Sequence, residues 1–244
     1  MTQHTTEQHT TYVRSMFTRI ARRYDLMNRL MTLGQDAAWR RDAVQRLGMP
    51  PDALVLDAGA GTGEIAAAIC RSRADARVVA CDLTPGMMTI GRARHAAGRI
   101  LWVSADAMHL PFAANRFDGV ISGFLLRNVA DLERALCEQQ RTLKPGARLV
   151  SLDTTPPPRS LQRPFLLFHL RVIIPLLGRL IAGDAEAYRY LPASTEGFLP
   201  AERLAERMQA AGVSAVSFLR RMLGTVAIHW GEKPGDGSPQ PHSS

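Results

Sequence analysis

The sequence predicts an α/β fold in which a seven-stranded, mostly parallel sheet carries helices on both faces. Short apolar runs alternate with helical segments as far as residue 153, the pattern that consecutive right-handed βαβ units produce. A glycine-rich loop joins the first run to the first of these helices. Two later apolar runs flank a glycine and predict an antiparallel strand pair at the C-terminal end.

The N-terminal segment predicts a helical cap on this sheet. Residues 1–10 are polar, and we expect them to be disordered. Apolar residues then recur three or four positions apart over 11–33, which gives a helix one apolar face. They are Phe17, Ile20, Tyr24, Met27 and Met31. We assign 11–50 to this cap.

Five apolar runs predict the parallel strands. They are 53–59, 77–83, 100–107, 117–126 and 147–153, with helices expected at 64–73, 86–96 and 131–143 and a turn at 144–146. The closing antiparallel pair is expected at 213–221 and 224–231. These elements define one domain, 11–231, followed by a disordered tail over 232–244 that is rich in glycine, proline and serine.

The most apolar window, 161–182, lies between the fifth strand and the closing pair. A membrane-spanning helix needs about 20 predominantly apolar residues, but three arginines and two prolines interrupt this window. We therefore predict an inserted helical lid over 161–195, which covers the substrate cleft or lies at a membrane surface. A helix buried in the core is the alternative.

Composition limits the classes of partner. The net charge is +8, which favours nucleic acid or anionic lipid as a partner, although an arginine-rich composition explains it equally well. Cys70, Cys81 and Cys137 are far apart and form no metal-binding motif, so neither a disulfide framework nor a metal site is expected. Without an apolar signal segment at the N-terminus, we expect a cytoplasmic protein.

The glycine loop predicts a cationic ligand. Its sequence, VLDAGAGTGEI, places Gly59, Gly61 and Gly63 between a strand and a helix, where glycine lets the backbone approach a ligand closely. Dinucleotide sites have G-x-G-x-x-G and hold a pyrophosphate. Here the spacing is G-x-G-x-G, and Asp57 and Glu64 would repel a pyrophosphate. S-adenosylmethionine (SAM), with a sulfonium and an ammonium group, fits this Rossmann-like loop better.

Acids at the next strand tips extend the predicted SAM site. Asp82 ends the second strand, where a carboxylate accepts hydrogen bonds from ribose hydroxyls, and Asp106 ends the third, where it could accept from the adenine amino group. Ser122 and Gly123 are expected to border the cofactor from the fourth strand. The predicted SAM contacts are Asp57, Gly59, Gly61, Thr62, Gly63, Asp82, Leu83, Asp106, Ala107, Ser122 and Gly123.

With these motifs the chain resembles class I SAM-dependent methyltransferases, and more narrowly the ubiquinone/menaquinone biosynthesis C-methyltransferase family. The likeness extends over roughly 13–231. It is carried by FTRIARRYDLMNRLMTLG with the WRR that follows it, and by DAMHLPFAANRFD, LLRNVAD, GDAEAYRYLPASTEGF and VAIHWG. It departs from the family at Leu125, where a glycine is usual, and at Leu152-Asp153-Thr154-Thr155-Pro156, where L-E-F-x-K-P is usual.

The resemblance implies SAM-dependent methylation of a ring carbon of a polyprenylated hydroquinone, without a metal. Arg127 is then the residue that stabilises a phenolate or polarises a water, because a guanidinium does not act as a base. Asn128 would orient the acceptor hydroxyl, and Asp153 is an alternative base. Tyr24 and Asp25 would close over the site from the N-terminal helix. An ion pair from Arg127 to an acid such as Asp131 is the structural alternative.

The resemblance implies the hydroquinone itself as a partner. The apolar window 161–182 and the excess of arginine predict peripheral contact with the anionic inner face of the cytoplasmic membrane. A homodimer is also considered, and no nucleic acid is expected. The departures leave the exact quinone open. Two other functions stay open as well. One is a SAM-dependent methyltransferase of another small apolar acceptor or of RNA, and the other is a non-catalytic SAM-binding module.

Overall fold

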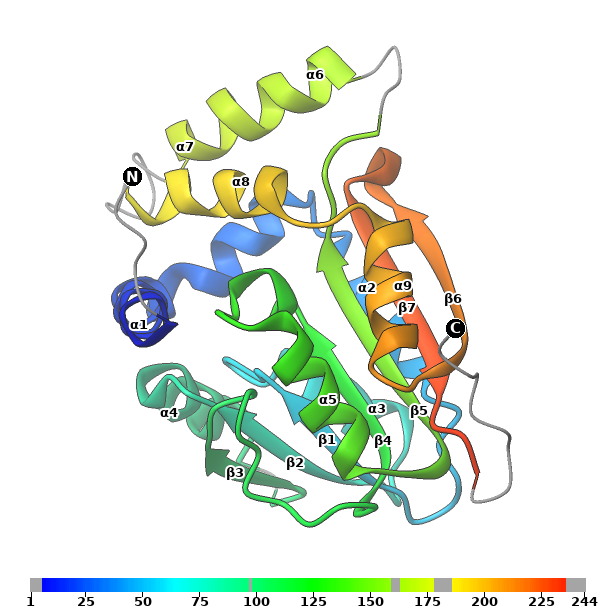
Figure 1. The fold of residues 1–244 in the computed structure, drawn as a ribbon. Helices are drawn as coiled ribbons and strands as arrows, with labels where there is room; N and C mark the ends of the chain where they lie inside the picture. Colours follow the sequence, from blue (N-terminus) through cyan, green and yellow to red (C-terminus); the bar gives the residue numbers. More distant parts are fainter. Residues whose placement is uncertain (1–5, 97, 159–162, 178–185, 236–244) are drawn as a thin grey trace.

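The computed structural model describes residues 6–96, 98–158, 163–177 and 186–235 (Figure 1). Within them, one seven-stranded sheet has the order β3-β2-β1-β4-β5-β7-β6. The strands are β1 Leu54–Ala58, β2 Arg77–Asp82, β3 Ile100–Ser104, β4 Phe117–Gly123, β5 Leu143–Thr154, β6 Ser214–Arg221 and β7 Val226–Glu232. Strands β1 to β5 pair in parallel, and β7 pairs antiparallel with β5 and β6. The predicted fold class is confirmed.

Helices cover both faces of the sheet because successive strand residues point to opposite sides. In β1, Val55 packs with helices α2 (Asp36–Arg46) and α3 (Glu64–Ser72). Its neighbour Leu56 packs on the other face with α5 (Leu132–Thr142) and α9 (Ala201–Ala210). Helix α4, Pro85–Arg94, follows β2.

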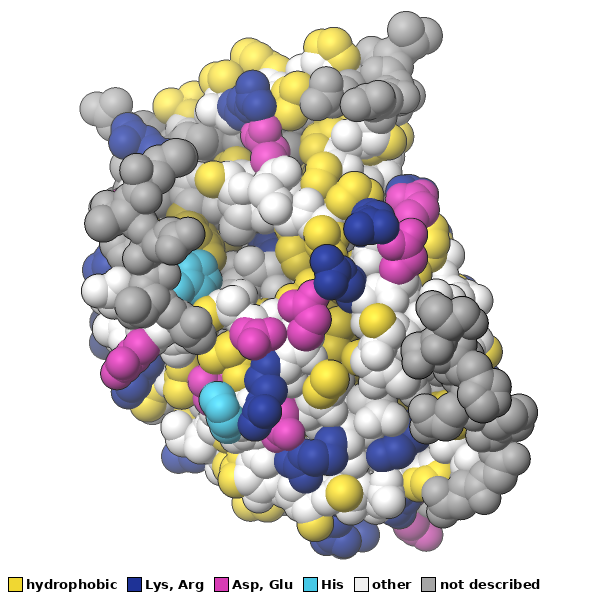
Figure 2. Space-filling model, in the orientation of Figure 1, with side chains coloured by type: hydrophobic (Ala, Val, Ile, Leu, Met, Phe, Trp, Pro, Cys, Tyr) yellow, Lys and Arg dark blue, Asp and Glu magenta, His cyan; other side chains and the backbone are white. Residues whose placement is uncertain are grey.

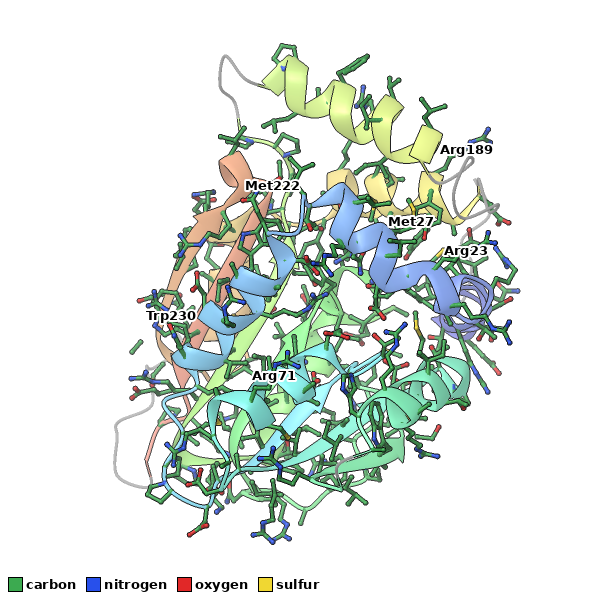
Figure 3. The ribbon with its side chains drawn as sticks, turned by 180° about the vertical axis from the view of Figure 1, so that it is seen from behind. Arg23, Met27, Arg71, Arg189, Met222 and Trp230 are labelled. Carbon is green, nitrogen blue, oxygen red and sulfur yellow. The ribbon has the colours of Figure 1, made fainter. Side chains whose placement is uncertain are left out.

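The N-terminal helix α1 spans Thr6–Met31. Its predicted apolar face, which includes Met27 (Figure 3), packs on the inserted helices. The helix begins earlier than expected, so residues 6–10 are helical rather than disordered. Two features favour this early start. Glu7 complements the helix dipole in the first turn, and His9 Nε2 lies 3.2 Å from the Asn128 carbonyl oxygen.

The inserted segment is helical over its described parts. It comprises α6 (Arg163–Phe168), the π-helical turn η2 (His169–Ile173), α7 (Ile174–Leu177) and α8 (Ala187–Gly197). These helices lie together beyond the carboxyl end of β5 (Figure 1). Residues 161–162 and 178–185 of the predicted lid lie outside the described residues. No helix in the described ranges is both long and apolar enough to cross a bilayer.

Three predicted element boundaries were wrong. The fourth strand stops at Gly123 instead of 126, because Phe124 adopts φ +57° and Leu126–Asn128 forms a 3-10 turn, η1. The third strand stops at Ser104 instead of 107, since the Asp106 carboxylate accepts a hydrogen bond from Met108 N at 2.8 Å and turns the chain. Residues 144–146 belong to β5 rather than to a turn.

Candidate active site

A cavity at the carboxyl ends of β1, β2 and β4, which we call the glycine-loop cavity, has a volume of about 1020 Å³ including space open to solvent. Nine of the residues predicted to contact SAM line it. They are Asp57, Gly59, Gly61, Thr62, Asp82, Leu83, Asp106, Ala107 and Gly123. They meet there because the tips of parallel strands share one edge of the sheet.

The two other predicted contacts do not line this cavity. Gly63 has φ +79° and begins α3, and a Cβ there would lie 2.4 Å from the Trp102 ring, so this glycine serves the turn and the packing of the loop. Ser122 is buried within β4. By contrast, a Cβ on Gly61 would meet no atom within 4 Å, and this glycine therefore faces open space.

Two buried carboxyl groups set the electrostatics of the glycine-loop cavity. Asp57 Oδ2 accepts a hydrogen bond from Ala66 N at 2.9 Å, whereas Oδ1 has no partner among the described residues. Burial, with a smaller effect from Asp82, raises the pKa of Asp57 to about 7. Burial also raises the pKa of Asp82, although Asp82 accepts hydrogen bonds from Gly61 N and Thr84 N. A cationic ligand is therefore favoured in this cavity, because its charge stabilises the ionised form of both carboxyl groups.

Helix α1 closes over the glycine loop through Asp25, which the sequence indicated, together with Tyr24, as a residue that could close over the site. Thr62 Oγ1 donates a hydrogen bond to Asp25 Oδ1 at 2.9 Å, and Arg94 pairs with the other oxygen of Asp25. Tyr24, beside it, lines the cavity. Burial raises the pKa of Tyr24, and the charge of Arg127 acts against that rise.

A second cavity of about 750 Å³, which we call the apolar cavity, lies between α1, α2 and the inserted helices. Its wall is mainly hydrophobic, and Met222 enters it from the end of β6 (Figure 3). The lining residues are Asn28, Met31, Thr32, Asp36, Trp39, Phe124, Arg127, Thr154, Leu166, Ile174, Leu191, Pro192, Thr195, Met222, Thr225 and Val226. Among the predicted catalytic residues, Arg127 is part of this wall.

Arg127 and Asp153 were predicted as alternative handlers of the proton, and the structure pairs them. Arg127 Nη1 donates to Asp153 Oδ1 at 2.5 Å, and the two side chains are only 6% and 2% exposed. Asp153 also accepts hydrogen bonds from the backbone of Arg127 and of Thr154. The structural alternative, an ion pair of Arg127 with a neighbouring acid, is therefore present, but the partner is Asp153. Asp131, the acid suggested for it, caps α5 by accepting a hydrogen bond from Arg134 N.

Asn128 lines the glycine-loop cavity rather than the apolar one. Its Nδ2 donates to the Phe124 carbonyl at 2.8 Å, and the Tyr190 hydroxyl donates to its Oδ1 at 3.2 Å. Tyr190 belongs to α8, and the sequence indicated it only as part of a longer motif. Asn128 thus ties the tip of β4 to the inserted helices.

Phe124 lines both cavities and is their shared wall. Its ring centroid lies 5.3 Å from Arg127 Cζ and 5.9 Å from Arg40 Cζ. Arg40 is itself paired with Asp36 one helical turn earlier. Neither member of this second ion pair was predicted as a site residue, although the Trp-Arg-Arg segment that contains Arg40 belongs to the N-terminal motif that carries the family resemblance.

Within the described residues, no group of three His, Cys, Asp or Glu side chains could hold a metal ion. Among the acids of the glycine-loop cavity, Asp57 and Asp82 lie at the ends of β1 and β2 and Asp106 follows β3, whereas Asp25 lies on α1 and Glu64 on α3.

Comparison with known proteins agrees with this geometry. The model of the ubiE/COQ5 methyltransferase family matches residues 3–233. A ubiquinone/menaquinone biosynthesis C-methyltransferase UbiE of Desulfotalea psychrophila is 49% identical over 221 residues, which is 91% of this chain and 90% of that protein. A demethylmenaquinone methyltransferase of Thermus thermophilus is 42% identical over 90% of this chain and 100% of its own length.

Solved structures are similar in fold. A SAM-dependent methyltransferase from Thermotoga maritima, described as a possible histamine N-methyltransferase, has a TM-score of 0.63 at 18% identity and covers 91% of this chain and 99% of its own. A phosphoethanolamine N-methyltransferase of Haemonchus contortus in complex with SAM has a TM-score of 0.60 at 15% identity, over 81% of this chain and 52% of its own. On the family match and these relatives, the chain belongs to the ubiE/COQ5 methyltransferase family.

Proposed function

We propose that this protein transfers a methyl group from SAM to a ring carbon of a polyprenylated hydroquinone, converting demethylmenaquinol to menaquinol or carrying out the equivalent step on a ubiquinone precursor. One observation carries the proposal. An acid-lined glycine-loop cavity and an apolar cavity share the Phe124 wall, with the Arg127 guanidinium at that boundary. The names of the relatives from Desulfotalea psychrophila and Thermus thermophilus support it.

The residues of the glycine-loop cavity fit SAM. The unpartnered Asp57 Oδ1 offers an acceptor to a cation, and Gly61 leaves open space beside the loop. Asp82 would accept hydrogen bonds from the ribose, while Asp106 and Ala107 would hold the adenine. When bound, SAM supplies an electrophilic methyl group. No metal is part of the proposal.

The apolar cavity fits a hydroquinone ring and the start of its prenyl tail. Loss of a hydroxyl proton makes the neighbouring ring carbon nucleophilic, and the Arg127 guanidinium would stabilise the resulting phenolate. A water molecule would take that proton, since a guanidinium is not a base at neutral pH. The ring carbon would form a bond to the methyl carbon as the methyl–sulfur bond of SAM breaks, and S-adenosylhomocysteine would leave. The same ring carbon would then lose its proton, and aromaticity would return. Asp153 holds Arg127 in place, while Asn128 and Tyr24 would position the hydroxyl from the cofactor side.

The inserted helix links the apolar cavity to the surface. Leu166 and Ile174 line the cavity, while Phe168, Val172 and Leu176, spaced four apart, are exposed on the outside. Figure 2 shows hydrophobic atoms gathered over α6 and α7. We propose that this exposed apolar stripe rests on the anionic inner face of the cytoplasmic membrane. A lipid-tailed acceptor could then enter the apolar cavity from the membrane. With a net charge of +8, binding to anionic vesicles should be salt-sensitive. Flotation no greater than that of a neutral soluble control would contradict this.

A labelled-SAM assay tests the reaction. The protein should transfer label to demethylmenaquinol or a demethylated benzoquinol, and transfer only to RNA would overturn the quinone proposal. Arg127→Ala should lower turnover about 100-fold, the scale of removing one group that stabilises developing charge, with SAM affinity nearly unchanged. Arg203→Ala, which removes an exposed arginine of α9, is the matched control and should keep full turnover. Loss of SAM binding by Arg127→Ala would instead indicate a structural ion pair.

A further inference from the structure

We infer that Arg40 binds the carboxylate of the methionine portion of SAM, held in position by its ion pair with Asp36. The inference rests on the proposed function, since it takes SAM as the occupant of the glycine-loop cavity. None of the motifs in the sequence assigns a role to Arg40.

The charges that line the cavity create the need for such a residue. Five acids face it: Asp25, Asp57, Glu64, Asp82 and Asp106. The sulfonium and ammonium groups of SAM suit these acids, but its carboxylate would be repelled unless it met a cation. Among the described lining residues, the basic side chains are those of Arg14 and Arg40. Arg14 is exposed on α1 and its charge is screened by water, whereas Arg40 is only 8% exposed.

Strand order places Arg40 at the end of the cavity where the methionine portion would lie. Asp82 and Asp106, the groups suited to ribose and adenine, follow β2 and β3 on one side of β1. Phe124 follows β4 on the other side of β1, and Arg40 Cζ lies 5.9 Å from its ring. Arg40 also lies near Asp57 at the tip of β1, where burial raises the pKa of Asp57 and the charge of Arg40 acts against that rise.

The ion pair with Asp36 holds the Arg40 guanidinium in position and uses only part of its N–H donors. Among the described residues, its hydrogen-bond partner is Asp36, one turn earlier on α2. Asp36 in turn accepts a hydrogen bond from Thr32 Oγ1 at 3.2 Å and lines the apolar cavity. A guanidinium has five N–H donors in a planar fork, so the donors that Asp36 does not use are free for a second carboxylate on the other side.

Calorimetry with two ligands isolates the carboxylate. Decarboxylated SAM keeps the sulfonium and the amino group and lacks only this carboxylate. The test variant combines Arg40→Met with Asp36→Asn, so that no buried acid is left without its partner. We expect its Kd for SAM to rise about 10- to 100-fold, the effect of losing hydrogen bonds to a charged group. Its Kd for decarboxylated SAM should stay the same or fall, which also shows that the variant is folded.

The other outcomes overturn the inference. Equal weakening for both ligands would mean that Arg40 only supports the fold, and unchanged affinity for both would mean that it does not reach the ligand. Arg14→Met is the matched control, and a selective loss of SAM affinity there would place the contact at Arg14 instead. If the unaltered protein bound no SAM, the proposed function would fail and this inference with it. Binding without methyl transfer would overturn only the proposed function.

Discussion

Asp57→Asn should stabilise the free protein at neutral pH while weakening its hold on SAM. Asp57 is fully buried, and one of its carboxylate oxygens has no partner among the described residues. Burial raises its pKa from 3.8 to about 7, and that rise corresponds to about 4 kcal/mol. Asparagine can still accept the hydrogen bond from Ala66 N without carrying a charge that must be desolvated.

The sign of the pH dependence follows from proton binding. Between pH 3.8 and pH 7 the Asp57 carboxyl is ionised in the unfolded chain and protonated in the folded one. The folded state therefore binds more protons, so the free energy of unfolding falls as the pH rises through this range and is level above it. The stability advantage of Asp57→Asn should grow by about 1.4 kcal/mol per pH unit from pH 5 to pH 7.

Urea unfolding of Asp57→Asn and of the unaltered protein at pH 5, 6, 7 and 8, followed by circular dichroism, measures the difference in their free energies of unfolding. Asp75→Asn is the control, because a hydrogen bond from Arg73 holds the pKa of Asp75 low. The Asp75 carboxyl is ionised in both the folded and the unfolded state above pH 5. Its substitution should therefore not change how the free energy of unfolding depends on pH. If the difference between Asp57→Asn and the unaltered protein were constant from pH 5 to pH 8, the reasoning about the buried charge would be refuted.

The protonation state of Asp57 should also control the affinity for SAM. A cationic ligand favours the ionised form of Asp57, so SAM affinity should rise with pH, by close to tenfold per unit below pH 7. Asp82 also has a raised pKa, but it is present in both proteins, and the comparison with Asp57→Asn removes its contribution. Calorimetry in two buffers of different ionisation enthalpy should detect a proton released on binding at pH 6, and the variant should release less.

Three further substitutions test individual contacts. Asp153→Asn leaves the buried Arg127 without its carboxylate, so the free energy of unfolding in urea should fall by about 3 to 5 kcal/mol and turnover should fall with it. Asp25→Asn weakens the contacts of α1 with the glycine loop and α4, and stopped-flow measurements should show several-fold faster release of SAM. Gly59→Ala introduces a Cβ 2.6 Å from Leu125 Cδ1 at φ +70° and should cost about 2 kcal/mol or more. Adding Leu125→Ala should recover part of that loss, and strictly additive effects would contradict the predicted contact.

The fold and most of the glycine-loop cavity were predictable because the signals are local. Apolar runs of strand length and helical spacing show in short windows, and a parallel sheet brings its strand tips together. Asp57, Asp82 and Asp106 could therefore be assigned to one cavity from their positions alone. Gly63 and Ser122 were assigned by the same rule, but their side-chain directions follow from packing that the rule does not contain.

The residues that the sequence did not indicate are those whose neighbours are set by distant packing. Arg40 faces Phe124 only because α2 packs on the sheet beside β4, and Tyr190 reaches Asn128 from a helix 62 positions along the chain. The bend at Phe124 was missed for a related reason. An apolar run predicts a continuing strand, but the Asn128 side chain bonds back to the Phe124 carbonyl and closes a turn instead.

This turn explains how Arg127 comes to lie at the boundary between the cavities. A bulky residue at φ +57° stores backbone strain of about 1 to 3 kcal/mol. Two hydrogen bonds hold it there, from Phe124 N to the Leu152 carbonyl at 2.7 Å and from Asn128 Nδ2 to the Phe124 carbonyl at 2.8 Å. Because the backbone turns at Phe124 rather than three residues later, Arg127 points back to Asp153 on β5. An extended strand would have carried Arg127 past the end of β5, beyond reach of this carboxylate, so the Arg127–Asp153 ion pair depends on the strained turn.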